Sequence, residues 1–305
     1  MMPDASGDAL VLTAPPGAGV LDAGAIGLAR AQLPKSAIGP ERWLGQGEAW
    51  EVLFAAGPEA DRGALRQRLA AALAPRPVDV NIVPGGARSR RKKLLVADME
   101  STIIQQECLD EIAGRIGLGT RISAITARAM RGELDFAAAL RERVGLLRGV
   151  DAGVLERVYE DVTLMPGAEI LIATMRRNGA TCALVSGGFT FFTERIAARL
   201  DFDVQQANAL DVADSRISGT VADPILGREA KLAALQRLAQ ERGLDAAETM
   251  AVGDGANDLA MIKAAGLGVA FRAKPIVMAE AAACVVHGDL TALLYLQGYT
   301  RAEFD

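Results

Sequence analysis

Histidine and cysteine are scarce in this chain of 305 residues, and their scarcity limits the chemistry that it can carry. His287 is the only histidine, too few for a histidine-based zinc site or a phosphohistidine mechanism. The three cysteines, Cys108, Cys182 and Cys284, are widely spaced and odd in number, which disfavours a disulfide framework and indicates a reducing compartment. None precedes a glycine-rich loop that ends in arginine, which disfavours a phosphatase with a cysteine nucleophile. The remaining candidates are carboxylates, hydroxyls, lysine, arginine and a hard metal ion.

Long apolar segments are also missing. Arg, Lys or Asp interrupts every apolar stretch before it reaches the length of a membrane span. The first residues, MMPDASGDAL, lack the basic and then apolar order of a secretory signal, so we expect a cytoplasmic protein without a membrane partner. The net charge of -5 argues against a nucleic-acid partner. The one dense basic run, Arg88 to Lys93, is expected to be a solvated linker.

Half of the residues are hydrophobic and 23% are charged, as in a globular protein with a substantial core. The first part of the chain predicts a small α+β domain over residues 1–85, followed by a basic linker over residues 86–93. Its predicted strands are DALVLTA, AWEVLFAA and VDVNIVP, and its predicted helices are LDAGAIGLARAQL and RGALRQRLAAALA.

Over residues 94–305, short apolar strands alternate with helices. The predicted strands are KLLVADM, ATCALVSGG, ETMAVGDG and LGVAF, and RISGTVADPIL suggests a small hairpin. Helices are predicted from MPGAEILIATMRRNG and GREAKLAALQRLAQERG, and a helical insertion over about 107–163, with breaks near Gly117–Gly119 and Gly149. This alternation predicts an α/β fold with a doubly wound parallel sheet and a helical cap.

Polar clusters follow three of these strands, where ligands bind in such folds. They are Asp98 and Glu100, then Ser186 and Gly187, then Asp254, Asn257 and Asp258.

The segment AVGDGANDLAMI places two acids and an amide beside two glycines. Spacings of three and four put Asp254, Asn257 and Asp258 on one side of a helical turn, and their oxygen atoms suit Mg²⁺. The alternative is a helix N-cap, which would explain one acid but not two. Ser186 and Gly187 offer a hydroxyl and backbone N–H groups for an anion, or else form an ordinary turn.

Taken together, DMEST, VSGG, the lysine of GREAKLAAL (Lys231) and GDGAND occur in the order and rough spacing of the haloacid dehalogenase superfamily, which this chain resembles over roughly residues 93–295. Without that context, Lys231 would be interpreted as a solvated residue of an amphipathic helix. Members often carry an N-terminal domain of the ACT type. The strand and helix order of residues 1–85 is similar to one, with one expected strand faint.

The resemblance implies a two-step hydrolysis of a phosphomonoester. Asp98 would attack phosphorus to give an aspartyl-phosphate, and Glu100 would protonate the leaving oxygen and then deprotonate the attacking water. Mg²⁺ would be held by Asp98, Asp254 and the backbone carbonyl of Glu100. Ser186, the Gly187 N–H and Lys231 would hold the phosphoryl oxygens, while Asn257 and Asp258 would orient the phosphate, Lys231 and water.

The resemblance also implies a substrate, O-phospho-L-serine, released as L-serine and phosphate in the final step of serine biosynthesis. Glu107, in QQECLDE, matches the acid that binds the substrate ammonium, and Arg143, in LRERVGLL, matches the arginine that binds its carboxylate. Phe136 could line the substrate site or pack in the core. Glu100 departs from the common Asp-x-Asp pattern, and we expect it to remain the acid–base because the carboxyl group is kept.

Three alternatives remain at this point. The chain could act on another small amino-acid-like phosphate, transfer the phosphoryl group to an acceptor such as homoserine, or be a non-catalytic amino-acid sensor. The N-terminal domain could also mediate a homodimer.

Overall fold

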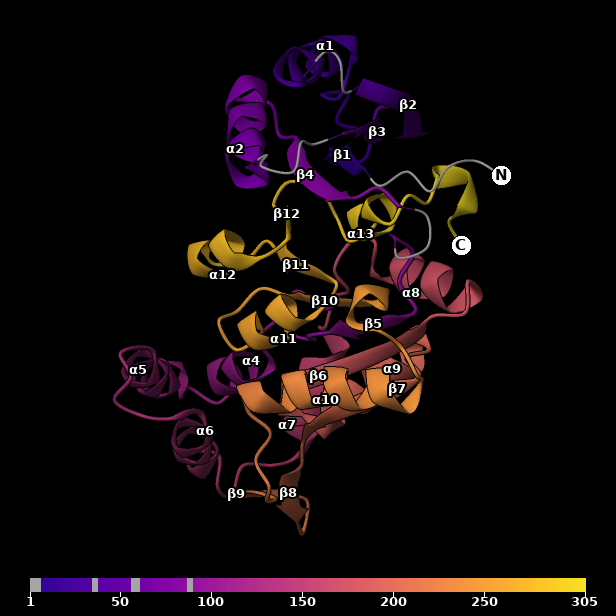
Figure 1. Cartoon of the computed structure of the whole chain (residues 1–305). Helices are drawn as coiled ribbons and strands as arrows, with labels where there is room; N and C mark the ends of the chain where they lie inside the picture. Colours follow the sequence, from indigo (N-terminus) through magenta and orange to yellow (C-terminus); the bar gives the residue numbers. More distant parts are fainter. Residues whose placement is uncertain (1–6, 35–37, 56–60, 87–89) are drawn as a thin grey trace.

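The computed structural model describes residues 7–34, 38–55, 61–86 and 90–305, and most of its strands lie in two sheets (Figure 1). One sheet has four antiparallel strands and the other has six parallel strands. The predicted α/β class with a doubly wound parallel sheet is therefore confirmed, together with an α+β layer before it. No helix in these described ranges is long and apolar enough to cross a membrane.

The four-stranded sheet comes from the first part of the chain and has the strand order β2-β3-β1-β4. Its elements are β1 (Asp8–Thr13), α1 (Ala23–Gln32), β2 (Ile38–Gly45), β3 (Ala49–Phe54), α2 (Arg62–Leu73) and β4 (Asp79–Pro84). This is the β-α-β-β-α-β order of the split βαβ motif. Residues 1–6, 35–37 and 56–60 of the predicted domain lie outside the described residues, and they include the last residue of the predicted strand AWEVLFAA.

Strand β2 was not predicted from the sequence. Its sequence, IGPERWLG, contains two glycines and a proline, and its first five residues are exposed. Proline and charged residues are tolerated there because β2 is an edge strand, which has no neighbour on one side. Without a buried face along most of its length, the strand shows no alternation of apolar and polar residues.

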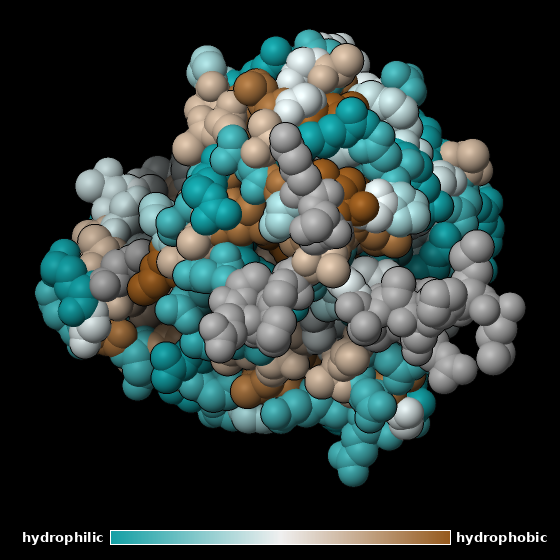
Figure 2. Space-filling model, turned by 45° about the horizontal axis from the view of Figure 1, so that its top comes forward, coloured by the Kyte–Doolittle hydropathy of each residue, from teal (hydrophilic) through white to brown (hydrophobic). Residues whose placement is uncertain are grey.

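The two faces of this sheet pack against different partners. Leu10, Leu12 and Val52 pack under α1 and α2, whereas Ala9 and Val11 belong to the core of the rest of the chain. On the surface in Figure 2, hydrophobic residues form separate groups among hydrophilic ones. The large apolar side chains that are exposed are scattered, as is ordinary for a folded chain.

The parallel sheet has the strand order β12-β11-β10-β5-β6-β7. Its strands are β5 (Leu94–Ala97), β6 (Thr181–Phe189), β7 (Val204–Asn208), β10 (Thr249–Gly253), β11 (Leu267–Phe271) and β12 (Ala283–Val285). On one face lie α10 (Arg228–Glu241), α11 (Leu259–Ala264) and α12 (Pro275–Glu280), and on the other α8 (Ala168–Arg177), α9 (Thr190–Leu200) and α13 (Ala292–Leu296). Because both faces are covered, β5 is apolar throughout.

The order of the strands creates a switch point at β5. The chain continues from β5 to β6 on one side and later returns to β10 on the other. Ligand sites of open α/β sheets lie beyond the carboxyl ends of the strands at such a point. The ends of β5 and β10 are therefore where a site is expected.

Four helices fill the region predicted to be a helical insertion. They are α4 (Cys108–Arg115), α5 (Gly119–Met130), α6 (Phe136–Gly145) and α7 (Gly153–Glu160), with α5 and α6 projecting beside the sheet in Figure 1. Gly117 and Gly149 break the helices with positive φ, as predicted, and Gly132 adds a break that was not predicted. The predicted hairpin lies slightly earlier: β9 (Arg216–Val221) pairs with β8 (Leu210–Ala213) before it.

The basic run is only partly the solvated linker that we expected, because Arg91 and Lys93 are exposed but two of its other residues are not. Residues 87–89 lie outside the described residues, but Arg90 and Lys92 are buried. The Arg90 guanidinium donates to buried Glu51 of β3 and to the Leu296 carbonyl, 3.2 Å away. A buried carboxylate from a distant strand thus compensates the charge of an arginine that is buried between the two sheets.

A second set of contacts joins β4 to the edge of the parallel sheet. The buried Asp79 carboxylate accepts the backbone N–H groups of Val286 (2.9 Å), His287 (3.1 Å) and Gly288 (2.8 Å). The Asn81 side chain, also buried, bonds the backbone N–H and carbonyl of Cys284 at 2.8 and 2.9 Å. These two side chains satisfy backbone groups that an edge strand would otherwise leave unpaired.

The substitution Asp79→Ala leaves three N–H groups of the junction without this acceptor, and we expect it to destabilise the fold by about 2–4 kcal/mol. Urea unfolding followed by tryptophan fluorescence measures this, because both tryptophans, Trp43 and Trp50, lie in the four-stranded sheet. Asp161→Ala is the control: it removes only an exposed ion pair with Arg115 and should cost less than about 1 kcal/mol. Equal losses in the two variants would contradict the role of Asp79.

Candidate active site

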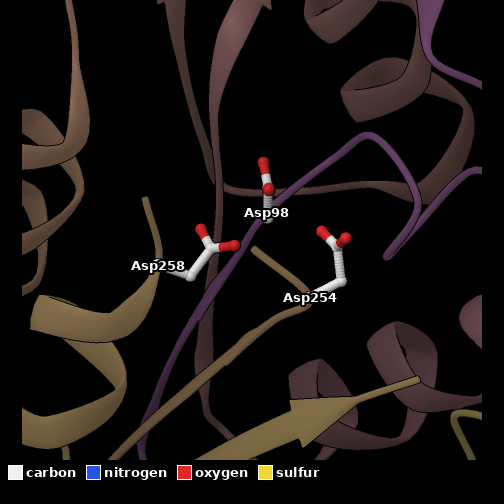
Figure 3. Close-up of side chains that lie close together, drawn as sticks. All are labelled: Asp98, Asp254 and Asp258. Carbon is white, nitrogen blue, oxygen red and sulfur yellow. The ribbon is translucent and has the colours of Figure 1, made fainter. Parts of the chain in front are cut away.

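Three carboxylates meet beyond the ends of β5 and β10. Asp98 directly follows β5, Asp254 follows β10, and Asp258 stands just before α11. Figure 3 shows their carboxyl groups close together, and an oxygen of each lies within 4.8 Å of the others. Asp98 and Asp258 are buried and Asp254 is half-buried. Such close carboxylates repel one another, so the site requires positive charge.

Glycines in the segment GDGAND allow these side chains to lie so close to the backbone. A Cβ atom on Gly253 would lie 2.3 Å from the Asp258 carboxyl carbon, and one on Gly255 would lie 2.2 Å from the Asn257 side-chain oxygen. Asp258 occupies the N-cap position of α11, but its side chain makes no capping bond. It accepts instead the Gly255 N–H at 3.0 Å. Helix capping therefore does not account for Asp258.

Lys231 supplies one positive charge to the cluster. Its Nζ atom lies 2.8 Å from Asp98 Oδ1 and 2.5 Å from Asp258 Oδ1, and only 2% of its side chain is exposed. Burial works to lower the pKa of Lys231, but the two carboxylates outweigh it and raise this pKa above its ordinary value. The lysine therefore stays protonated. It is also buried, whereas its helix alone would indicate a solvated residue.

The cluster still has an excess of negative charge. Burial, followed by the charge of Asp258, raises the pKa of Asp98, and Lys231 opposes them. Burial, followed by Asp258 and Glu107, raises the pKa of Asp254 to about 6. None of the described residues hydrogen-bonds or ion-pairs with the Asp254 carboxylate. Three oxygen ligands with one ammonium between them fit a hard divalent cation.

Strand β6 bulges where it carries Ser186 and Gly187. Val185 pairs with Gln206 and Phe189 with Asn208, so three residues of β6 lie opposite one residue of β7. Ser186 is buried, and its Oγ atom accepts the Gly188 N–H at 2.9 Å. The bulge therefore gives the predicted Ser-Gly-Gly turn a defined shape at the same sheet edge as Asp98.

Glu100 reaches from the β5 end toward two other elements. Its Oε1 atom accepts the Cys108 N–H at the start of α4, at 2.8 Å, and a Cβ atom on Gly188 would lie 2.9 Å from its Oε2 atom. Burial, followed by the charge of Glu107, raises the pKa of Glu100 to about 7, and the bond from Cys108 opposes this. The charge that helps to keep a proton on Glu100 thus comes chiefly from Glu107.

The helical cap contributes three further candidates at this edge, Glu107, Arg143 and Phe136. Glu107 is exposed at the start of α4 and accepts the Ser101 hydroxyl at 2.7 Å. Arg143 of α6 is half-buried and donates to the Ala139 carbonyl at 3.3 Å, with no carboxylate of the described residues in ion-pair contact. Burial lowers the pKa of Arg143, and nearby acids that include Glu100 and Glu107 oppose this.

Phe136 lies at the start of α6 against the Ser-Gly-Gly turn. A Cβ atom on Gly187 would lie 3.0 Å from its ring, and one on Gly227 would lie 3.3 Å from it. Phe136 is half-buried, so its ring borders the site and also packs against the core.

Sequence reasoning missed two groups at the site. One is the Cys108 N–H, a backbone group for which side-chain patterns give no signal. The other is Asn208, whose side chain donates to the Gly187 carbonyl at 2.9 Å. A polar residue at the end of a strand would have indicated Asn208. Strand β7 itself was not recognised, because two polar glutamines follow its first residue.

Known proteins are similar to this chain over the region that carries these residues. The model of the haloacid dehalogenase-like hydrolase family matches residues 95–263, which include every site residue named above. A phosphoserine phosphatase of Streptomyces coelicolor is 44% identical over 241 residues, which cover 79% of this chain and 59% of that relative. One of Haemophilus influenzae is 45% identical over 219 residues, covering 72% of this chain and 70% of the relative.

The fold has a close counterpart among solved structures. The unliganded crystal structure of a probable phosphoserine phosphatase from Vibrio cholerae superposes with a TM-score of 0.77 at 30% identity. The superposition covers 98% of this chain and 88% of that chain, and so includes the four-stranded sheet.

The substitution Gly253→Ala places a Cβ atom where the Asp258 carboxyl group lies, so we expect a loss of about 1–3 kcal/mol in stability. Gly114→Ala is the matched control, since Gly114 lies inside α4 with open space around it and alanine favours the helix by about 0.4–1 kcal/mol. Urea unfolding of both variants measures the difference. Equal stability of the two variants would contradict the close packing of Asp258 on Gly253.

Proposed function

Since the chain belongs to the haloacid dehalogenase-like hydrolase family, we propose that it hydrolyses O-phospho-L-serine to L-serine and phosphate, the final step of serine biosynthesis. The observation that carries the proposal is the buried Lys231 ammonium between Asp98 and Asp258, with Asp254 beside them. The names of the relatives support phosphoserine over another small phosphate or an acceptor such as homoserine. The complete acidic cluster also favours an enzyme over an amino-acid sensor.

In this proposal Asp98 is the nucleophile. Its carboxylate stands at the end of a rigid strand, and Met99 N–H and Lys231 hold its Oδ1 atom, each at 2.8 Å. Oδ2 is then the oxygen available to attack phosphorus and form an aspartyl-phosphate. Lys231, Ser186 and the Gly187 N–H bind the phosphoryl oxygens as charge shifts toward the leaving group.

We propose Mg²⁺ as the cation, held by Asp98, Asp254 and the Glu100 backbone carbonyl. When bound, it neutralises charge between an anionic nucleophile and a phosphate dianion. Asp258 then serves to hold Lys231, and Asn257 helps to orient the phosphate, as the close packing of both on the loop glycines supports.

Glu100 is proposed as the proton donor and acceptor. A pKa near 7 lets a carboxyl group give a proton to the serine oxygen and then take one from water at neutral pH. Its longer side chain, compared with aspartate, is held by the Cys108 N–H.

Substrate selection is proposed to rest on Glu107 and Arg143. A half-buried guanidinium that ion-pairs with no carboxylate of the described residues suits the carboxylate of an amino acid, and Glu107 suits its ammonium group. For the rest of the chain, we propose an ACT-like domain over residues 1–85, a homodimer formed through it, and a cytoplasmic location.

The proposed function is tested by phosphate release from phosphoserine with and without Mg²⁺. We expect turnover that is lost when EDTA removes the metal, restored by Mg²⁺, and abolished in Asp98→Asn, because both charge neutralisation and the nucleophile are required. Turnover that persists in EDTA or in Asp98→Asn would overturn the proposal.

The role of Glu100 is tested by Glu100→Gln, which keeps an acceptor for the Cys108 N–H but has no acidic proton. We expect kcat to fall by about 10²–10⁴-fold, the usual contribution of a general acid–base. Glu111→Gln, on the exposed side of α4, should leave kcat unchanged. Near-normal turnover by Glu100→Gln would remove Glu100 from the mechanism.

Specificity is tested by Arg143→Ala, compared with Arg141→Ala, which removes only an exposed ion pair with Asp223. Phosphoethanolamine lacks the carboxylate of phosphoserine. We therefore expect the preference for phosphoserine over phosphoethanolamine, measured as a ratio of kcat/KM, to fall by about tenfold or more in Arg143→Ala alone. An unchanged ratio would show that Arg143 does not bind the carboxylate.

A further inference from the structure

The bulge in β6 creates a backbone group that the sheet cannot satisfy. Residues 186–188 lie opposite Ala207 alone, so the ladder between β6 and β7 is interrupted there. The Gly187 carbonyl, in the middle of the bulge, is bonded by the side-chain amide of Asn208 at 2.9 Å. At this point a side-chain N–H thus takes the place of a backbone N–H of the neighbouring strand as the hydrogen-bond donor.

The same amide also bonds the chain that leads into α10. Its nitrogen donates to the Leu226 carbonyl at 3.2 Å, and its oxygen accepts the Leu226 N–H at 2.7 Å. Asn208 is only 1% exposed, and both N–H groups and the oxygen of its amide are used. A buried amide that is fully bonded on both sides holds its partners in one arrangement.

These two partners carry groups that the proposed reaction uses. Gly187 and Ser186 form the turn on β6, while Leu226 is followed by Gly227, the N-cap of α10, and by Lys231 in its first turns. The turn and α10 are far apart in the sequence but lie side by side in the fold (Figure 1). One side chain therefore fixes the serine turn relative to the helix that presents the lysine.

We propose that Asn208 is a positioning residue for phosphate binding: its amide sets the separation between the Ser186–Gly187 turn and the start of α10. The proposal rests on the proposed function, in which Ser186, the Gly187 N–H and Lys231 bind the phosphoryl oxygens. Asn208 itself acts only through these groups. A small displacement between them weakens binding of phosphate and slows its transfer, because such reactions depend steeply on alignment.

Asn81 offers a matched control for this role. It is also a buried asparagine, and its amide also bonds a backbone N–H and a backbone carbonyl, those of Cys284, at 2.8 and 2.9 Å. Asn81 lies at the junction between the two sheets and not at the proposed phosphate site. Its replacement has a comparable structural cost without a direct effect on phosphate.

The experiment compares Asn208→Ala with Asn81→Ala in three measurements on the full chain. They are the thermal unfolding midpoint, kcat and KM for phosphoserine with Mg²⁺, and the affinity for inorganic phosphate by calorimetry with Mg²⁺. We expect both midpoints to fall. Only Asn208→Ala should lose about 10- to 100-fold in kcat/KM and bind phosphate about tenfold more weakly.

A further variant separates positioning from packing. Asn208→Asp keeps the size and the acceptor for the Leu226 N–H, but it has no N–H groups for the Gly187 and Leu226 carbonyls, so it should lose as much activity as Asn208→Ala. If Asn208→Ala does not fold, Asn208→Ser is compared with Asn81→Ser by the same measurements and the same criteria.

The proposal is overturned if the folded Asn208 variants keep kcat/KM and phosphate affinity within about twofold of the Asn81 variants. A parent protein that binds phosphate but releases none from phosphoserine would instead overturn the proposed function, and the phosphate affinities would still test Asn208.

Discussion

The Lys231 ammonium, buried between Asp98 and Asp258, is the interaction on which the rest of the site depends. Without it, two buried carboxylates would face each other at the end of the parallel sheet. Removing one partner from a buried charge network costs about 3–5 kcal/mol, because the remaining charge is left uncompensated. The lysine that α10 holds there favours the ionised form of Asp98, against burial and the charge of Asp258, which raise the pKa of Asp98.

This requirement explains features that lie outside the site itself. Strands β5 and β10 must be neighbours so that Asp98 and Asp254 leave the sheet side by side. Gly253 must lack a side chain so that Asp258 can pack against the backbone and reach the lysine. The start of α10 must also be fixed relative to the bulge of β6, and the hydrogen bonds of Asn208 to Gly187 and Leu226 connect the two. The acidic cluster, the loop glycines and the buried amide thus form one connected arrangement.

The sequence was sufficient to predict the parallel sheet and the positions of Asp98, Ser186 and Asp254 at its edge, because apolar strands that alternate with helices bring strand ends together. It was insufficient where a contact joins distant segments. The buried state of Arg90 depends on Glu51, whose position relative to the linker no local pattern reveals.

The same limit applies to side chains whose partners are backbone groups. The bond from the Cys108 N–H to Glu100, and the bonds of Asn208 to Gly187 and Leu226, follow from the path of the chain and not from residue types. The edge strand β2 was missed for a related reason, since an exposed strand needs no alternation of apolar residues.

The most direct measurement of the central claim is the site of covalent phosphorylation during turnover. Phosphoserine labelled in its phosphate is mixed with the protein and Mg²⁺ and quenched rapidly in acid. The protein is then digested, and the labelled residue is identified by mass spectrometry. The account predicts an acyl phosphate on Asp98 that is absent from Asp98→Asn. Turnover without a phosphorylated Asp98, or with the label on another residue, would contradict it.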